Sequence, residues 1–287
     1  MTENGSNMLA IRFFDQRVFV RALDDASSDL LARGFCDFES ALVDMDSDET
    51  PNATLSRTSV DWNLTSTVDG SIWNETTEAG ALCRLDEILT FVVAGGVHHA
   101  IAIHAGAVCD DEGNTIIMVG ESGAGKSTLV SLMLARGWRY LTDELVVIEE
   151  NGTVHGWPRL IHLKGGAREV IAEQSSVDAT HPRWFRGEHV DLVAPEAVAA
   201  KVVREGELRA IVFPRFERNA PTTTIKLRGI DAATNMTQQL VNARNLPKLG
   251  LPSLVALCRK TPAWAFAYSE HEAVDSLLSA IMSEWAS

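Results

Sequence analysis

The sequence predicts an α/β protein with a mixed sheet and a β-rich N-terminal part, and three observations carry this prediction. An apolar strand, a glycine-rich loop and a helix follow one another over 115–137. A turn too short for a crossover joins that strand to the strand before it. Residues 1–75 contain short apolar runs separated by polar turns, which is typical of strands. We expect a β-rich region over 1–96, packed on a core domain over 97–287.

Composition sets the class of protein. With 287 residues, of which 46% are apolar, the chain can bury a sizeable core. The net charge of −14 argues against nucleic acid, or an anionic membrane surface, as the main partner. Residues 1–7 are polar and lack the apolar centre of a signal peptide, which predicts a cytoplasmic location.

The N-terminal elements come first in the chain. Two hairpins and an amphipathic helix are expected, the helix from apolar residues at helical spacing and a glycine pair that ends it. The first hairpin joins 9–14 to 18–23, the second joins 55–62 to 65–68 with Asn63 and Leu64 between them, and the helix covers 82–92 before Gly95 and Gly96.

The next two strands are expected at 100–108 and 115–119. The polar turn over 110–114 is short, so the strands have to run antiparallel, because a parallel pair needs a long crossover. This argues against a simple doubly wound sheet, in which neighbouring strands are joined through helices.

The loop after the second strand fits the phosphate-binding pattern G-x-x-x-x-G-K-[ST]. It consists of Gly120, Glu121, Ser122, Gly123, Ala124, Gly125, Lys126, Ser127 and Thr128. Unpaired N–H groups at a helix start attract phosphate, and glycines let the backbone curl closely around it. Lys126 can reach the β- and γ-phosphates, and the Ser127 hydroxyl can join a Mg²⁺ shell. We expect ATP and Mg²⁺ as cofactors; the alternative is a chance glycine-rich loop.

A pair of acids follows the helix. The strand expected over 138–142, beside the phosphate-loop strand, ends in Asp143 and Glu144. Consecutive strand residues point to opposite faces, so both acids can face the phosphates only if the strand breaks there. One carboxylate would then hold Mg²⁺ and one would accept a proton from the attacking hydroxyl. The alternative is an exposed acidic turn.

The remaining elements complete the core. His104 lies in the apolar strand 100–108, where it is either a site residue or a satisfied core histidine. The irregular stretch 175–208 is long enough to be a functional excursion. Strands are expected at 145–148, 153–155, 160–164, 210–213, 222–227 and 263–268, and helices at 167–174, 232–242, 252–259 and 270–285.

The segment from His104 through the phosphate loop to Glu144 resembles the core of the HPr kinase/phosphorylase family. In that family a His-Gly or His-Ala step precedes the phosphate loop, and an Arg-Gly element ending in two acids follows its helix. Its nucleotide core is similar to that of the ATP-dependent phosphoenolpyruvate carboxykinases, which implies the same mixed-sheet kinase core here. The stretch 213–216 and the terminal strand and helix resemble HPr-kinase-like proteins of peptide-modification gene clusters.

The resemblance implies roles for single residues. Lys126 and Ser127 would be the phosphate and Mg²⁺ residues. Asp143 would be the general base toward a serine hydroxyl, Glu144 a ligand of the metal or its water shell, and His104 a polar neighbour of the acids. It also implies hexamers or smaller homo-oligomers.

Two arginines are candidates for stabilising the transferring phosphoryl group, Arg159 and Arg215, the alternative for each being an ordinary surface arginine. The chain departs from the family at Thr128, where Glu is usual, and at Glu144, where Asp is usual. The Arg-Gly-Leu-Gly-Ile-Ile signature is missing near 160–172. These departures argue against the reverse reaction and against HPr as the substrate.

Three hypotheses for function follow. The first is a Mg·ATP-dependent kinase that phosphorylates a serine hydroxyl on a peptide or small protein. The second is a small-molecule kinase on the same scaffold, in which only the acceptor pocket differs. The third is a nucleotide-binding regulatory module without catalysis. Nucleic acid and membranes are not expected as partners.

Overall fold

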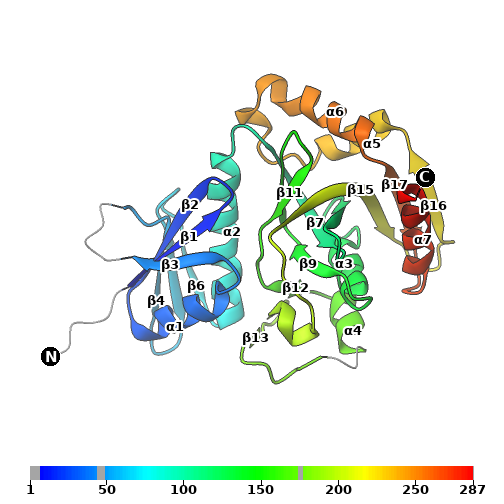
Figure 1. Ribbon diagram of the computed structural model, residues 1–287. Helices are drawn as coiled ribbons and strands as arrows, with labels where there is room; N and C mark the ends of the chain where they lie inside the picture. Colours follow the sequence, from blue (N-terminus) through cyan, green and yellow to red (C-terminus); the bar gives the residue numbers. More distant parts are fainter. Residues whose placement is uncertain (1–6, 44–48, 174–176, 287) are drawn as a thin grey trace. The chain divides into compact units, whose positions relative to one another are not determined.

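The structure, a computed structural model, describes residues 7–43, 49–173 and 177–286 and is a mixed α/β protein with mixed sheets (Figure 1). The polar start at 1–6 and residues 174–176, which end one expected helix and begin the expected excursion, lie outside the described residues. The chain divides into two compact units. The first comprises Met1–Gly96, Arg159–Lys164 and Asp178–Ala197, and the second comprises Val97–Pro158, Gly165–Val177 and Val198–Ser287.

The first unit is built on a six-stranded sheet of order β3-β1-β2-β4-β5-β6. Its elements are β1 (Asn7–Phe13), β2 (Gln16–Ala22), α1 (Asp25–Gly34), β3 (Glu39–Val43), β4 (Ala53–Arg57), β5 (Trp62–Ser66), β6 (Ile72–Glu75) and α2 (Glu78–Gly96). Figure 1 shows the long helix α2 alongside this sheet, and its buried side includes Leu82, Leu85 and Leu89. In the described ranges no helix is long and apolar enough to cross a membrane.

The two hairpins expected in this unit have different outcomes. β1 and β2 pair antiparallel from Asn7–Ala22 to Phe13–Gln16, which confirms the first hairpin. The second was placed wrongly: β4 ends at Arg57, and Asn63 and Leu64 lie inside β5 rather than in a turn. The Thr58 Oγ1 atom accepts hydrogen bonds from Asp61 N and Val60 N, so a side-chain-stabilised turn forms earlier in the chain.

Two later segments belong to the first unit, although the sequence assigned them to the core domain. Strands β12 (Ile161–Leu163), β13 (Trp184–Phe185) and β14 (Asp191–Val193) form a small sheet of order β12-β14-β13. Helix α2 contacts β14. The pairing of β12 with β14 joins residues about thirty positions apart, so no local sequence pattern predicts it. The expected excursion over 175–208 therefore carries strands of its own within the described residues.

The second unit is built on an eight-stranded mixed sheet of order β11-β10-β7-β8-β15-β17-β16, with β9 also paired to β7. Its strands are β7 (Ile101–Cys109), β8 (Asn114–Val119), β9 (Arg139–Thr142), β10 (Leu145–Ile148), β11 (Thr153–Gly156), β15 (Glu205–Phe216), β16 (Thr223–Leu227) and β17 (Ala263–Tyr268). Its helices are α3 (Lys126–Leu134), α4 (Gly166–Ala172), α5 (Gly229–Thr237), α6 (Leu251–Lys260) and α7 (Ala273–Trp285).

The turn between β7 and β8 forms as its composition predicts. The Asp110 Oδ1 atom accepts hydrogen bonds from Glu112 N and Asn114 N, and Gly113 takes a positive φ of 92°. The two strands pair antiparallel, with Cys109 opposite Thr115 and Ala105 opposite Val119. The expected antiparallel pairing of these two strands is therefore confirmed.

One strand lies elsewhere than expected. β9 was expected beside β8, but it pairs antiparallel with β7, on the side away from β8. The other neighbour of β8 is β15, which runs parallel to β8 and to β17. A parallel partner requires a long connection, and here residues 120–204 lie between the two strands.

The two faces of β7 have different partners. Ile103 and Ala105 share a buried cluster with Met236 of α5 and Leu254 of α6. The opposite face meets α3: a Cβ added at Gly106 would lie 2.8 Å from the Val130 Cγ2 atom. The missing side chain lets α3 lie directly on the sheet, and α3 also contacts β8 and β9.

A buried amide fixes the start of β7. Asn242 Oδ1 accepts a hydrogen bond from Ala102 N, and its Nδ2 donates to Val97 O and Ala100 O. The side chain is only 2% exposed, so water cannot replace these bonds. We expect Asn242→Ala to lower the free energy of unfolding by about 1–3 kcal/mol, measured by urea titration, because Ala102 N and Ala100 O lose this buried partner. Val97 O keeps a hydrogen bond from Asn245 Nδ2 at 3.2 Å. The exposed Asn235→Ala serves as the control and should change stability little.

Candidate functional site

The glycine-rich loop joins the end of β8 to the start of α3. Gly123 and Gly125 take positive φ angles of 85° and 97°, which an L side chain adopts only with strain. Gly125 occupies the position before the first helical residue, and its carbonyl accepts the hydrogen bond from Leu129 N. Gly125 has no side chain that could cap this helix start. The loop thus presents backbone N–H groups at a helix N-terminus without a side-chain competitor.

The Lys126 ammonium lies within the loop. Its Nζ atom donates to Gly120 O at 2.7 Å and to Glu121 O at 3.0 Å, and the residue is only 6% exposed. A buried ammonium needs such partners, and a phosphate offers stronger, charge-assisted ones. The loop therefore holds one cation at its centre, where an anion between the glycines would meet it.

The ends of two parallel strands support the loop from one side. Phe216 N, at the end of β15, donates to Ala124 O at 3.1 Å, and the Tyr268 hydroxyl, at the end of β17, donates to Gly125 O at 3.2 Å. A Cβ on Gly125 would lie 2.8 Å from the Tyr268 Oη atom and 3.1 Å from the Phe216 Cβ atom. Burial raises the pKa of the Tyr268 hydroxyl, which keeps it protonated as a donor.

The acid pair lies where the chain leaves β9 and before it enters β10. Asp143 is 2% exposed, and its Oδ1 atom accepts the Tyr140 hydroxyl at 3.1 Å. Glu144 N donates to Thr142 Oγ1 at 3.1 Å, and the Glu144 side chain is about one-third exposed. The bend between the two strands frees both acids from strict alternation. Asp143 therefore lies in a dry setting, and Glu144 in a wetter one.

Strand register places the acids near the loop. Ala105 of β7 pairs with Val119, the last residue before the loop, and its N–H donates to Glu144 O at 3.0 Å. The acid pair and the loop entrance therefore lie in one row across the sheet, two strand spacings or about 10 Å apart. Helix α3, which lies over β7 and contacts β9, spans this same interval.

His104 lies beside the acids. It pairs with Leu145 in the β7–β10 ladder, and its Nε2 atom is 3.5 Å from Glu144 Oε1. Its side chain is 32% exposed, so it is not a fully buried core histidine. The described contacts thus connect His104 to Glu144, while Asp143 contacts Tyr140.

Three oxygen donors were expected to hold Mg²⁺, namely the Ser127 hydroxyl and the carboxylates of Asp143 and Glu144. Oxygen ligands suit this ion, which keeps several waters and binds phosphate oxygens in nucleotide sites. Among the described residues, no group of three or more His, Cys, Asp and Glu side chains gathers as a metal site. Each of the three residues would supply an oxygen atom of the kind that Mg²⁺ prefers.

The two arginine candidates lie in different surroundings. Arg159 lies in the first unit, where its Nη1 atom donates to Asp86 Oδ2 at 2.8 Å and the side chain is 8% exposed. Its guanidinium is thus held in a buried ion pair within that unit. Arg215 is 73% exposed, forms an ion pair with Glu217 and immediately precedes Phe216, which bonds to the loop. Arg215 is therefore the candidate that the fold places next to the loop.

Three residues around the loop and the acids were not predicted to have a role in the site: Tyr140, Tyr268 and Phe216. Tyr140 stands three residues before Asp143, so its contact could have been sought in the sequence. Phe216 reaches the loop through the parallel pairing of β15 with β8, and Tyr268 through the parallel pairing of β17 with β15. No local pattern connects them to the loop.

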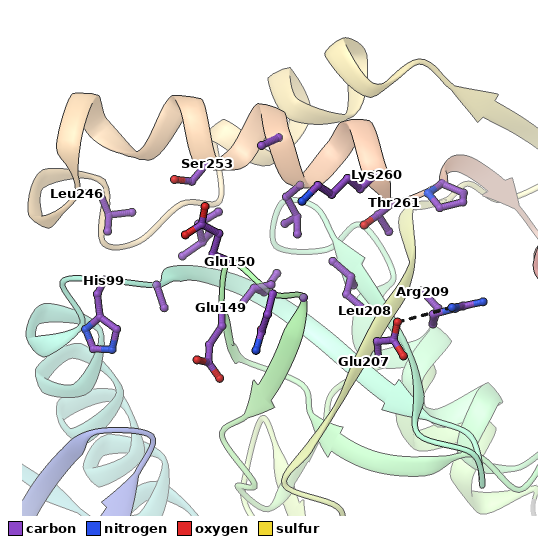
Figure 2. Close-up of a pocket in the computed structure, with 18 of the residues that line it drawn as sticks. His99, Glu149, Glu150, Glu207, Leu208, Arg209, Leu246, Ser253, Lys260 and Thr261 are labelled. Carbon is purple, nitrogen blue, oxygen red and sulfur yellow. Dashed lines mark ion pairs between the residues drawn. The ribbon is translucent and has the colours of Figure 1, made fainter.

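A pocket of about 470 Å³ lies next to α6, at the ends of the strands that face away from the loop (Figure 2). Glu149 and Glu150 follow β10, Glu207 and Arg209 lie near the start of β15, and Lys260 ends α6. Glu207 pairs with Asn114 at the start of β8, so the length of β8, about 20 Å, separates this row from the glycine-rich loop. The pocket is large enough for a ligand but contains no residue of the loop or of the acid pair.

Comparisons with known proteins add little to this geometry. No family model matches the chain, and no curated protein matches its sequence. Among solved structures, the chain is similar to the HPr(Ser) kinase/phosphatase from Coxiella burnetii at 13% sequence identity and a TM-score of 0.31, over 64% of this chain and 95% of that one. At this TM-score the likeness carries no weight, and function has to be argued from the residues of the site.

Proposed function

We propose that this protein is a Mg·ATP-dependent kinase that transfers the γ-phosphate to a serine hydroxyl of a peptide or small protein. The observation that carries the proposal is the placement of a glycine-rich loop, with a buried lysine, in the same row of the sheet as a buried aspartate. A phosphate cradle alone supports binding. A carboxylate about two strands away supports proton removal from a hydroxyl next to the bound phosphates.

The loop residues would hold the donor nucleotide. The N–H groups at the start of α3 and the Lys126 ammonium would bind the β- and γ-phosphates, with Lys126 exchanging its bonds to Gly120 O and Glu121 O for phosphate oxygens. Ser127 and one of the two acids would hold Mg²⁺, which neutralises phosphate charge when bound. Arg215 would meet charge on the transferring group, which its position next to Phe216 supports, and for Arg159 this role stays a prediction.

In the transfer step, the serine oxygen forms a bond to the γ-phosphorus while the bond from that phosphorus to the β–γ bridging oxygen breaks. Asp143 accepts the proton of the hydroxyl, and ADP leaves with the electron pair of the broken bond. Glu144, with His104 beside it, would hold the metal or its water shell.

The test combines binding and transfer. Calorimetric titration should show Mg·ATP binding to the wild-type protein, and γ-labelled ATP should transfer label to serine-containing peptides but not to their alanine counterparts. Lys126→Ala is expected to reduce transfer by about 100-fold or more, because one preorganised donor to the phosphates is lost. The matched control is Lys226→Ala, which removes an exposed lysine that pairs with Glu284.

Other results would redirect the assignment. Turnover of small hydroxyl compounds without any peptide would favour the small-molecule kinase. Tight Mg·ATP binding with no transfer to peptide, metabolite or water would favour the regulatory module. A wild-type protein that binds no Mg·ATP would overturn the proposal altogether.

A further inference from the structure

Both tyrosines of the chain direct their hydroxyl groups at the candidate site. The sequence contains two tyrosines, Tyr140 and Tyr268. One hydroxyl donates to the Asp143 carboxylate and the other to the Gly125 carbonyl. The two hydrogen bonds therefore fall on separate parts of the site, one on the proposed base and one on the phosphate loop.

Tyr140 is fixed before it reaches Asp143. It is fully buried and pairs with Val108 on one side of its strand. On the other side, Tyr140 N donates to Lys201 O at 2.8 Å and Tyr140 O accepts from Val203 N at 2.9 Å. Backbone bonds on both edges leave the ring little freedom to move. Its hydroxyl therefore offers Asp143 a donor in a fixed position.

Tyr268 is held with equal firmness at the end of β17. Its ring is fully buried, stacks on Phe266 at 4.9 Å and meets Phe216 edge-on at 5.4 Å. Its carbonyl accepts a hydrogen bond from Glu217 N at 3.0 Å. The strand ends of β15 and β17 thus form a rigid support, from which the Tyr268 hydroxyl holds the Gly125 peptide in its left-handed conformation.

We propose that the two tyrosines are positioning residues with separate tasks. Tyr268 fixes the phosphate loop and so sets the affinity for the nucleotide. Tyr140 orients the Asp143 carboxylate and so sets the rate of the transfer step. The inference rests on the proposed function. Each tyrosine acts through another residue, and a hydroxyl-to-hydrogen change should separate the two tasks.

The test uses Tyr268→Phe and Tyr140→Phe, each of which is the control for the other. Mg·ATP affinity is measured by calorimetry, and the chemical step by single-turnover hydrolysis of γ-labelled ATP, in which water replaces the unidentified acceptor and yields ADP and phosphate. Tyr268→Phe is expected to weaken binding about tenfold, with the rate at saturating ATP unchanged. Tyr140→Phe is expected to lower that rate about tenfold, with binding unchanged.

The outcomes separate the inference from its premise. If the wild-type protein binds no Mg·ATP, the proposed function fails. If it binds and both variants lose affinity and rate alike, or neither changes, the division of tasks fails. If one variant does not fold, the wild-type protein can be labelled with fluorotyrosine and studied by fluorine NMR. It gives two resonances, and the spectrum of the variant that does fold, which lacks one of them, assigns both. A Tyr268 resonance unmoved by bound Mg·ATP would then refute its role.

Discussion

Replacing Asp143 by asparagine is expected to lower phosphoryl transfer by about 10²–10⁴-fold, the usual contribution of a general base. Asparagine preserves the shape of the side chain, and its carbonyl oxygen can still accept the Tyr140 hydroxyl. It cannot accept a proton from the attacking hydroxyl. The protein should therefore stay folded and keep its affinity for ATP. Single-turnover transfer from γ-labelled ATP and calorimetry on the same sample would check both parts of the prediction.

Glu144→Gln is the matched control, because it neutralises the adjacent acid in the same bend. This variant is expected to change the dependence of the rate on Mg²⁺ concentration more than the rate at saturating Mg²⁺, since Glu144 is about one-third exposed and lies beside His104. If Asp143→Asn retains full transfer and Glu144→Gln loses it, the two roles have been exchanged and the base assignment is wrong.

The sequence was sufficient for the elements around the loop because their causes are local. The turn at Asp110 closes through bonds within five residues, so the antiparallel β7–β8 pair could be predicted from it. The second N-terminal hairpin was missed for a related reason. Two stretches could have formed the turn, one before and one after Trp62. Trp62 and Leu64 are buried and alternate with the less buried Asn63 and Thr65, and this alternation keeps the later stretch in β5.

The support of the site could not be predicted in the same way. The partner of β8 is β15, and the two strands meet only because the sheet forms as a whole. Tyr268 reaches Gly125 across 143 residues of sequence. Arg159 is the opposite case, a residue close to the acids in sequence that binds elsewhere. Its partner is the buried Asp86, which the sequence around Arg159 does not indicate. Contacts that depend on the pairing of strands far apart in sequence cannot be predicted from local motifs or from hydrophobic periodicity.

Gly125→Ala is the second prediction with a large effect, and it tests the loop geometry directly. The backbone at Gly125 has a φ of 97°, and the added Cβ would come within 2.8 Å of the Tyr268 Oη atom. The loop has to shift, and the N–H groups at the start of α3 shift with it. We expect Mg·ATP affinity to fall by at least about tenfold, measured by calorimetry, with a loss of about 1–2 kcal/mol in the free energy of unfolding.

Gly137→Ala separates strain from function, because Gly137 lies just after the same helix with a similar φ of 88° and nothing within 4 Å of the added Cβ. It should lose about the same 1–2 kcal/mol of stability, measured by urea unfolding, since the left-handed backbone disfavours any Cβ. Its affinity for Mg·ATP should equal that of the wild type. Equal loss of affinity in the two variants would trace the effect to general destabilisation, whereas loss in Gly125→Ala alone would trace it to the loop.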